Sequence, residues 1–400
     1  MAKRKKKVGG GAFGSGKKAE PSIPKPKLDS VMSVRDSERM TKMIHKIIAS
    51  KDFGSVDEVQ RFVQEHLAGR EMEELEAMLP DDGPQSDFDR AESLIEGIPE
   101  GTAPEEVVRI AKQALTLSED CMGAWFEYGV YAEDAATALE RFEQGIERGR
   151  VRFEEQIRES GEGHGLWGYV EARDFMRLLE EKAKALVELG ELEQAAEVYQ
   201  EMLALNPLDN QGIRGDLLRI FTIHHRRDEA RSLLDRFPND AMVDMAYGRA
   251  LLEILEAAEK TGMLIPDADR PGAPASPAAF LKSLGPEFQP AIKLLNHAVK
   301  VNPFVPIFMT HGSLLEVEVD DLAGLGGPYE AVIYAQQWCL LWFVSGLPFL
   351  LLSGASPGNL KKIAKSSHLI EELIDVTDQL EEVELLDGLP WWEKFEVEPM

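Results

Sequence analysis

Apolar residues recur every three or four positions over much of the chain, which is the spacing of helices with one buried side. In the stretch MTKMIHKIIAS, the apolar side chains fall on a single stripe made of Met40, Met43, Ile44, Ile47 and Ile48. Further on, SVDEVQRFVQEHL begins with Ser55 and has Glu58 three positions later, a pattern typical of a helix start. These patterns predict an N-terminal helical cap over residues 28–100.

Two later segments share one pattern of small, bulky and turn-forming residues. They read EQAAEVYQEMLALNPLDN, from residue 193, and QPAIKLLNHAVKVNPFVP, from residue 289. Five positions recur at a distance of ninety-six residues: Ala195, Tyr199, Met202, Asn206 and Pro207 correspond to Ala291, Leu295, Ala298, Asn302 and Pro303. Two unrelated helices would rarely agree over so many positions, so the chain contains an internal repeat.

The spacing within the first segment is that of the second half of a tetratricopeptide repeat, a pair of antiparallel helices. Each position has a physical reason. Gly190 makes the turn, Ala195 lets two helices approach closely, Tyr199 fills the adjoining groove, and Pro207 ends the helix. The sequence therefore predicts an all-α fold, a right-handed α-solenoid of tetratricopeptide-like helix pairs with helical caps at both ends.

The same spacing predicts four units between residues 88 and 240, a fifth first helix in MVDMAYGRALLEILEAA, and a sixth half-unit over 289–303. The proline- and alanine-rich stretch TGMLIPDADRPGAPASPAAF separates these last two. The predicted organisation is a disordered basic tail (1–27), an N-terminal helical cap (28–100), a repeat array (101–258), a linker (259–288), a C-terminal helical region (289–390) and a final tail (391–400).

Several motifs resemble known families. FEQGIERG, GHGLWGYVEARDFM and NPLDNQGIR resemble a family of bacterial tetratricopeptide-repeat proteins. AIKLLNHAVKVNPFVP, followed by PYEAVIYAQQW, is similar to the end of the eukaryotic suppression of tumorigenicity seven family. The resemblance covers about residues 88–345 and implies the repeat fold and protein binding, with no catalytic residues to transfer.

Charge is unevenly distributed along the chain. Residues 1–27 carry nine Lys or Arg and one acid, while the remaining residues carry 35 basic and 70 acidic residues. A body near −35 repels phosphates, so we expect no nucleic-acid partner. Cys121 and Cys339 are the only cysteines, too few for a disulfide framework, and this usage favours the reducing cytoplasm.

One segment raises the alternative of a membrane-associated protein. Residues 331–359 contain no charged side chain and include WCLLWFVSGLPFLLL, so 331–352 could anchor the chain to a membrane. Two glutamines lie early in the run, and SGLP interrupts its middle. We therefore favour two short buried helices over an anchor.

Enzymatic motifs are weak. Residues 11–18, GAFGSGKK, have the spacing of a phosphate-binding loop but end in Lys18 where such loops have the Ser or Thr that holds magnesium. Adjacent His224 and His225 point about 100° apart on a helix, so they do not converge on one metal ion, and we favour a solvated helix end. We identify no Ser, His and Asp set with a recognisable nucleophile elbow. We predict a non-enzymatic protein without cofactor or metal; a nucleotide-dependent enzyme or hydrolase remains the third alternative.

The candidate binding surface is the side of the first helices that lines the concave face of such a solenoid. In the third and fourth units it would carry Arg177, Glu180, Lys184 and Val187, then Gln211, Arg214, Leu218 and Phe221. A cluster of Arg177, Lys184 and Arg214 would suit a carboxylate or an acidic peptide; alternatively, the three cations pair with neighbouring acids.

Trp167, with Tyr169 and Phe175, could grip a peptide or could pack an inserted turn against the stack. The sequence thus predicts an interaction scaffold that binds a protein or peptide, with six candidate partner-binding residues: Arg177, Lys184, Arg214, Gln211, Phe221 and Trp167.

Overall fold

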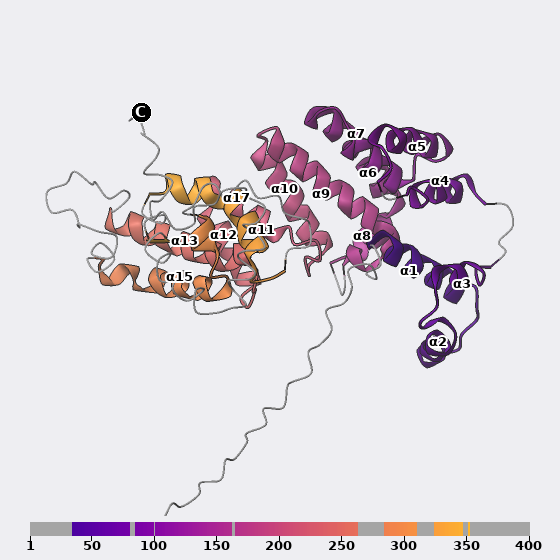
Figure 1. Ribbon diagram of the computed structural model, residues 1–400, viewed down its shortest axis with the longest axis horizontal. Helices are drawn as coiled ribbons and strands as arrows, with labels where there is room; N and C mark the ends of the chain where they lie inside the picture. Colours follow the sequence, from indigo (N-terminus) through magenta and orange to yellow (C-terminus); the bar gives the residue numbers. More distant parts are fainter. Residues whose placement is uncertain are drawn as a thin grey trace, which may run out of the picture. The chain divides into compact units, whose positions relative to one another are not determined.

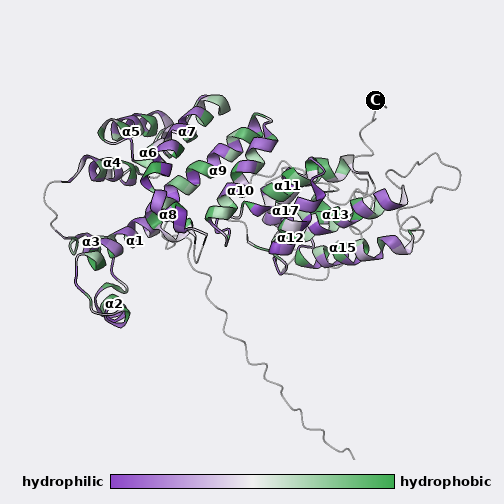
Figure 2. Ribbon diagram, turned by 180° about the vertical axis from the view of Figure 1, so that it is seen from behind, coloured by the Kyte–Doolittle hydropathy of each residue, from purple (hydrophilic) through white to green (hydrophobic). Residues whose placement is uncertain are grey.

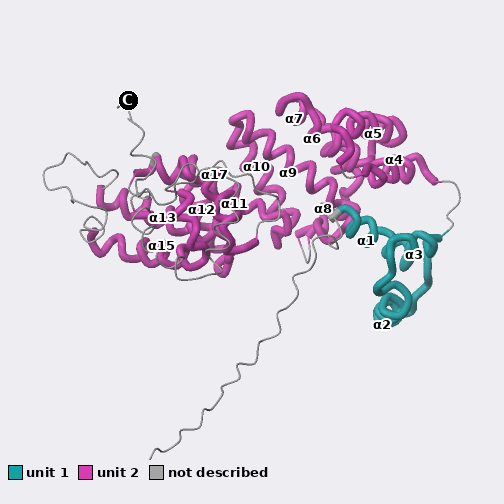
Figure 3. Tube along the Cα trace, in the orientation of Figure 1, with its two compact units in different colours: residues 1–83 teal, residues 84–400 magenta. Residues whose placement is uncertain are grey.

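The computed structural model describes residues 34–80, 85–99, 101–161, 165–262, 284–309, 324–346 and 351–352. Over these residues the regular structure is helical, without strands. They belong to two compact units, Met1–Gly83 and Pro84–Met400 (Figure 3). The predicted tails 1–27 and 391–400, and most of the predicted linker 259–288, lie outside the described residues.

The first unit is a small cluster of helices around α1 (Val34–Ala49). After it come α2 (Val56–Phe62), the one-turn π-helix η2 (Val63–Leu67) and α3 (Met72–Glu76). The Ser55 hydroxyl accepts a hydrogen bond from the Glu58 amide, as the sequence predicts. The core is formed by Met43, Ile47, Leu67 and Leu75.

The second unit is built from helix pairs packed in series (Figure 1). The first helices of the pairs are α4 (Asp87–Glu96), α6 (Met122–Val130), α9 (Arg173–Glu188), α11 (Arg214–Ile223) and α13 (Val243–Thr261). Their partners are α5 (Pro104–Leu117), α7 (Ala135–Arg152), α10 (Leu192–Leu205), α12 (Arg227–Arg236) and α15 (Gln289–Val301). Shorter pieces lie between α7 and α9: α8 (Glu154–Glu159), η3 (Leu166–Gly168) and η4 (Val170–Ala172).

The pairing at the end of the series differs from the sequence prediction. The predicted fifth first helix, α13, and the predicted sixth half-unit, α15, pack closely against each other. They form one pair whose connection is long, so the two half-units that spacing assigned to a fifth and a sixth unit belong to the same unit. At the other end, α4 packs on α5 and α6 and belongs to the second unit, although its residues fall within the predicted cap 28–100.

Small residues allow the helices of each pair to approach closely. A Cβ atom added to Gly145 of α7 would stand 2.6 Å from the Trp125 Cβ of α6. Ala195 and Ala298, two of the repeated positions, are fully buried. Polar and apolar residues alternate along the helices, as expected where one side faces a core (Figure 2).

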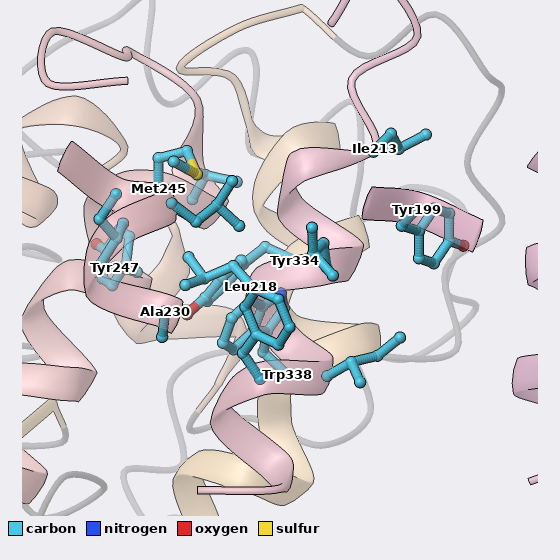
Figure 4. Packing of buried hydrophobic residues seen from close by; sticks show 14 of the residues in the cluster. Tyr199, Ile213, Leu218, Ala230, Met245, Tyr247, Tyr334 and Trp338 are labelled. Carbon is cyan, nitrogen blue, oxygen red and sulfur yellow. The ribbon is translucent and has the colours of Figure 1, made fainter. Parts of the chain in front are cut away.

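Residues 331–344 of the uncharged segment lie in α17 (Pro328–Val344), which follows the short α16 (Val305–Phe308) and packs against α13; residues 347–350 and 353–359 lie outside the described residues. Tyr334 and Trp338 stack with ring centroids 5.3 Å apart, next to Leu218 and Tyr247 (Figure 4). The Tyr247 hydroxyl donates to the Asn302 carbonyl at 2.7 Å. Much of the apolar character of α17 is therefore accounted for by burial in the protein core, although Leu340 is 69% accessible.

Replacing Ala195 or Ala298 with Asp should destabilise the second unit, because a carboxylate would enter a packed helix–helix contact without a partner. We expect a loss of several kcal/mol and a fall in the unfolding midpoint of roughly 5–15 °C. Ala204→Asp, on the exposed side of α10, is the control and should change the midpoint little. A midpoint that barely moves for both buried variants would contradict the observed packing.

Candidate partner-binding face

One side of α9 and α11 is mostly polar and shares Arg177, Glu180 and Lys184 with the surface that the sequence predicts; we call it the first-helix face. Helical spacing of three and four residues places its members on one side of each helix, and all are half-buried or exposed. On α9 they are Asp174, Arg177, Glu180, Glu181, Lys184 and Glu188; on α11 they are Asp216, Arg219 and Ile223.

Between α9 and α11 the first-helix face is less tightly closed than elsewhere. Neighbouring first helices pack directly at α4–α6, α6–α9 and α11–α13, whereas α9 is joined to α11 mainly through α10. The side chain of Gln211, just before α11, spans this junction. Its Nε2 donates to the Met176 carbonyl at 3.2 Å and to Glu180 Oε2 at 2.7 Å. We call this junction the crease.

Lys184 lies beside the crease and is the most exposed of the three predicted cations, with half of its side-chain surface accessible. Its Nζ is 2.8 Å from Glu180 Oε1 and 2.8 Å from Glu181 Oε1. Partial burial lowers its pKa, but the two carboxylates outweigh this and raise the pKa above its ordinary value. Lys184 is therefore positively charged at any physiological pH.

Two buried polar atoms at the first-helix face have no hydrogen-bond partner among the described residues. They are Gln211 Oε1, an acceptor, and Arg219 Nε, a donor. The Arg219 guanidinium otherwise uses Nη2, which donates to Asp216 Oδ1 at 3.0 Å. Buried polar atoms are nearly always paired, so an unpaired acceptor and an unpaired donor on one face require an explanation.

Tyr199 of α10 lies beneath these groups and is almost completely buried. Burial raises the pKa of its hydroxyl, and the nearby carboxylates of Asp216 and Glu180 raise it further. The phenol therefore stays neutral. Its role in the repeat pattern is the packing role that the sequence predicts.

Arg177 and Trp167 lie together at the start of α9. Arg177 Nη1 is 2.7 Å from Asp174 Oδ1, and its guanidinium is 5.9 Å from the centre of the Trp167 ring. Arg173 lies closer to the same ring, at 5.1 Å, and its Nε donates to the Trp167 carbonyl. Trp167 thus packs the inserted η3 turn against α9, which is the second of the two roles considered for it.

Arg214 occupies an internal ion-pair network. Only 13% of its side chain is accessible, and it is held between Asp209, at 2.8 Å, and Asp240. Asp209 also accepts from the amides of Ile213 and Arg214, so it fixes the start of α11. This arrangement places Arg214 away from a partner's reach, contrary to the expected cluster of three exposed cations.

Phe221 is also buried, with 2% of its surface accessible, and the Arg226 guanidinium covers its ring at 4.6 Å. It points to the other side of α11 from Asp216 and Arg219. Of the six predicted residues, the structure brings Arg177, Lys184, Gln211 and Trp167 onto or beside the first-helix face. Sequence spacing missed Arg219, whose regular helical spacing from Asp216 was the available signal.

The electrostatic character of the face differs from the expectation of a basic cluster. Its cations are Arg177, Lys184 and Arg219, each within ion-pair distance of a carboxylate. It also carries five acids, so the formal charge of the face is −2. The alternative considered from sequence, in which the cations pair with neighbouring acids, describes this surface.

Successive first helices share a contact in their first turns. Gly123, Asp174, Gly215 and Asp244 are each the second residue of their helix, in α6, α9, α11 and α13. A Cβ added to Gly123 would lie 3.2 Å from Asp174 Oδ2, and one added to Gly215 would lie 2.9 Å from Asp244 Cγ. Each glycine therefore makes room for the aspartate of a later first helix.

At α13 this contact is covered by α17. Trp338 Nε1 donates to Asp244 Oδ1 at 2.7 Å, and Glu330 Oε1 accepts from the Val243 amide. Burial raises the pKa of Asp244 to about 6. The Trp338 hydrogen bond opposes this change, while the charges of Asp216 and Glu330 add to it.

Comparisons with known protein families, with curated proteins and with solved structures give no match to this chain. Within the described ranges, no group of His, Cys, Asp and Glu is arranged to hold a metal ion. Over the same part of the chain, no helix has both the length and the apolar character needed to cross a membrane.

Asp244 should make the stability of the second unit depend on pH. Because its pKa is about 6 in the folded protein and about 3.9 in an unfolded chain, the folded state binds the proton more tightly. This group therefore destabilises the fold above pH 6, and the penalty is relieved as the pH falls toward 4. Asp244→Asn, which removes the titration, should be stabilised relative to the native protein at pH 8 by on the order of 2 kcal/mol.

Chemical denaturation of both proteins between pH 4.5 and 8 measures this difference. The stability gap between Asp244→Asn and the native protein should shrink steadily with decreasing pH. Asp228→Asn, at an exposed position of α12, provides the control and should show no such trend around pH 6. A gap for Asp244→Asn that stays constant over this range would rule out the titration.

Proposed function

We propose that this protein is an interaction scaffold that binds a segment of a partner protein along the first-helix face. In this proposal the helix pairs form a right-handed tetratricopeptide-like α-solenoid, with α1–α3 and α17 as caps and the first-helix face on its concave side. The protein acts by holding its partner and carries out no reaction. The two free thiols, Cys121 and Cys339, suit a reducing compartment, so we assign the function to the cytoplasm.

The observation that supports the proposal is the unpaired acceptor and donor at the first-helix face, Gln211 Oε1 and Arg219 Nε. An extended peptide backbone supplies both complements, because each residue offers an N–H donor and a C=O acceptor. Because both atoms are buried, a bound segment would pair them only after the Gln211 and Arg219 side chains turn toward it. Leaving them unpaired costs about 1–3 kcal/mol each, and binding would recover part of this.

Lys184 gives the proposal its charge preference. The Lys184 side chain is half exposed, and its ammonium group pairs with Glu180 and Glu181. A carboxylate from the partner could therefore share it. The net negative charge of the face limits this preference to single carboxylates, since a run of acids would be repelled.

The apolar end of the face adds a third element of recognition. Ile223 and Leu189 are exposed large apolar residues at the C-terminal ends of α11 and α9. An apolar side chain of the partner could pack there, beyond the charged part of the face. The preferred ligand is thus a short extended segment with one carboxylate and one apolar side chain.

The test is a binding measurement with partners purified on the full chain from native cell extract. Lys184→Ala combined with Arg219→Ala should weaken binding by on the order of a hundredfold, since each charge-assisted contact contributes about 1.5–3 kcal/mol. Increasing salt should weaken binding by the native protein as well.

Arg109→Ala combined with Lys112→Ala is the matched control. It removes the same charge from α5, where Arg109 is exposed and pairs with Glu106 of its own helix. This variant should bind as the native protein does. Equal affinities for the two double variants would show that the first-helix face does not bind the partner.

A further inference from the structure

A second surface lies on the opposite side of α11, where α10 and α12 flank a depression of about 300 Å³. Its floor is apolar and consists of Leu203, Leu217, Phe221 and Leu233. At about 100° per residue, Leu217 and Phe221 lie roughly 150° around α11 from Asp216 and Arg219. The depression, which we call the slot, is therefore separate from the first-helix face.

Two arginines of the α12 segment bridge to α10 and delimit the slot. Arg226, at the start of α12, is 2.8 Å from Glu193 of α10. Arg236, the last residue of α12, donates through Nη2 to the carbonyls of Leu203 and Pro207, each at 3.0 Å. Two of the four floor residues, Leu217 and Phe221, belong to α11, on which α10 and α12 both pack.

The two ends of the slot differ in charge. At the Arg226 end, Glu229 lines the slot but is already paired with Arg226, which also contacts Glu193. At the Arg236 end, the guanidinium is exposed and uses only Nη2. The distance along the helix from Glu229 to Arg236 is roughly 10 Å, so their fields act on different parts of a ligand.

Hydrogen-bond donors near Arg236 are unused. Among the described residues, Gln200 and Ser232 have no side-chain partner, and Nε and Nη1 of Arg236 have none either. Ser232 and Arg236 are four residues apart on α12 and so lie on the same side of the helix. A carboxylate is the group that would accept from an amide, a hydroxyl and a guanidinium together.

We infer that the slot binds a peptide segment of a partner protein in which an apolar side chain is followed closely by an acidic residue. The carboxylate accepts hydrogen bonds from Arg236, Ser232 and Gln200. The apolar side chain packs at the edge of the slot beside Leu203 and Leu233, because Leu217 and Phe221 are only 1% and 2% accessible. The unused donors fix the direction, because those of Arg236 lie at one end, whereas Arg226 at the other end is already paired with Glu193 and Glu229.

The slot would give the scaffold a second attachment point that works independently of the first-helix face. A partner bound along that face leaves the slot open, since the two surfaces use opposite sides of α11. One chain could therefore hold two segments at once, and linking two weak sites can raise the overall affinity by orders of magnitude.

The test uses nuclear magnetic resonance of leucine methyl groups in the full chain, with short synthetic peptides as probes. The first probe is acetyl-Gly-Ser-Leu-Glu-Gly amide; the others replace its Glu with Gln or its Leu with Gly. We expect the first peptide to shift the Leu217 and Leu233 methyl signals in a saturable way. The Gln peptide should bind about tenfold more weakly or worse, and the Gly peptide should cause no saturable shift.

Variants on one helix then separate the slot from its surroundings. Arg236→Gln should remove the preference for Glu over Gln, while Arg231→Gln, which loses the same charge on α12 but pairs toward α13, should keep it. Ser232→Ala should weaken binding without loss of stability. Lys184→Ala with Arg219→Ala should leave the slot titration unchanged, so failure of the proposed function and failure of this inference are distinguishable.

Saturable shifts with the Glu preference, lost in Arg236→Gln and kept in Arg231→Gln, support the slot. Three results would overturn it: no saturable shift at peptide concentrations of several millimolar, equal binding of the Glu and Gln peptides, or an unchanged preference in a folded Arg236→Gln protein.

Discussion

The arrangement of the second unit depends on helix contacts so close that there is no room for a Cβ atom. At Gly145 the neighbour is Trp125, and at Gly215 it is the carboxylate of Asp244 in the next first helix. The first contact sets the distance within a pair, and the second sets the distance between pairs. Because both contacts require a glycine, they fix the positions of the first helices. Those positions decide which side chains lie on a common surface.

Ion pairs contribute to the packing of helices that bury few apolar side chains. In α12 only Ala230, Leu233 and Leu234 are buried. Its arginines reach outward in both directions: Arg231 to α13, and Arg236 to α10. Because the chain is so acidic, an arginine readily finds a carboxylate partner. A cation that still has unused hydrogen-bond donors is therefore a candidate for binding a partner protein.

The sequence could predict the helices and their pairing pattern, because apolar spacing and small residues act within one or two turns. The buried positions of Ala195 and Ala298 follow from that pattern alone. The partner of α13 could not be predicted, because spacing along the chain does not say which helix closes a long connection. The surroundings of Arg214 and Phe221 were also missed, since their neighbours Asp240 and Arg226 come from other elements. A repeat pattern identifies which residues share one face of a helix, whereas the exposure of each side chain depends on contacts with other elements.

The pairing of α13 with α15 has a consequence for the order of folding. α9 and α10 are joined by the three residues between Glu188 and Leu192, whereas 27 residues lie between Thr261 and Gln289. For a flexible chain, bringing two helices together across the longer separation costs about 2 kcal/mol more in chain entropy. The middle pairs can therefore form early from local contacts, and the α13–α15 pair, with α17 packed upon it, should join a surface that is already built. In this chain the last pair to assemble would be one that closes the core.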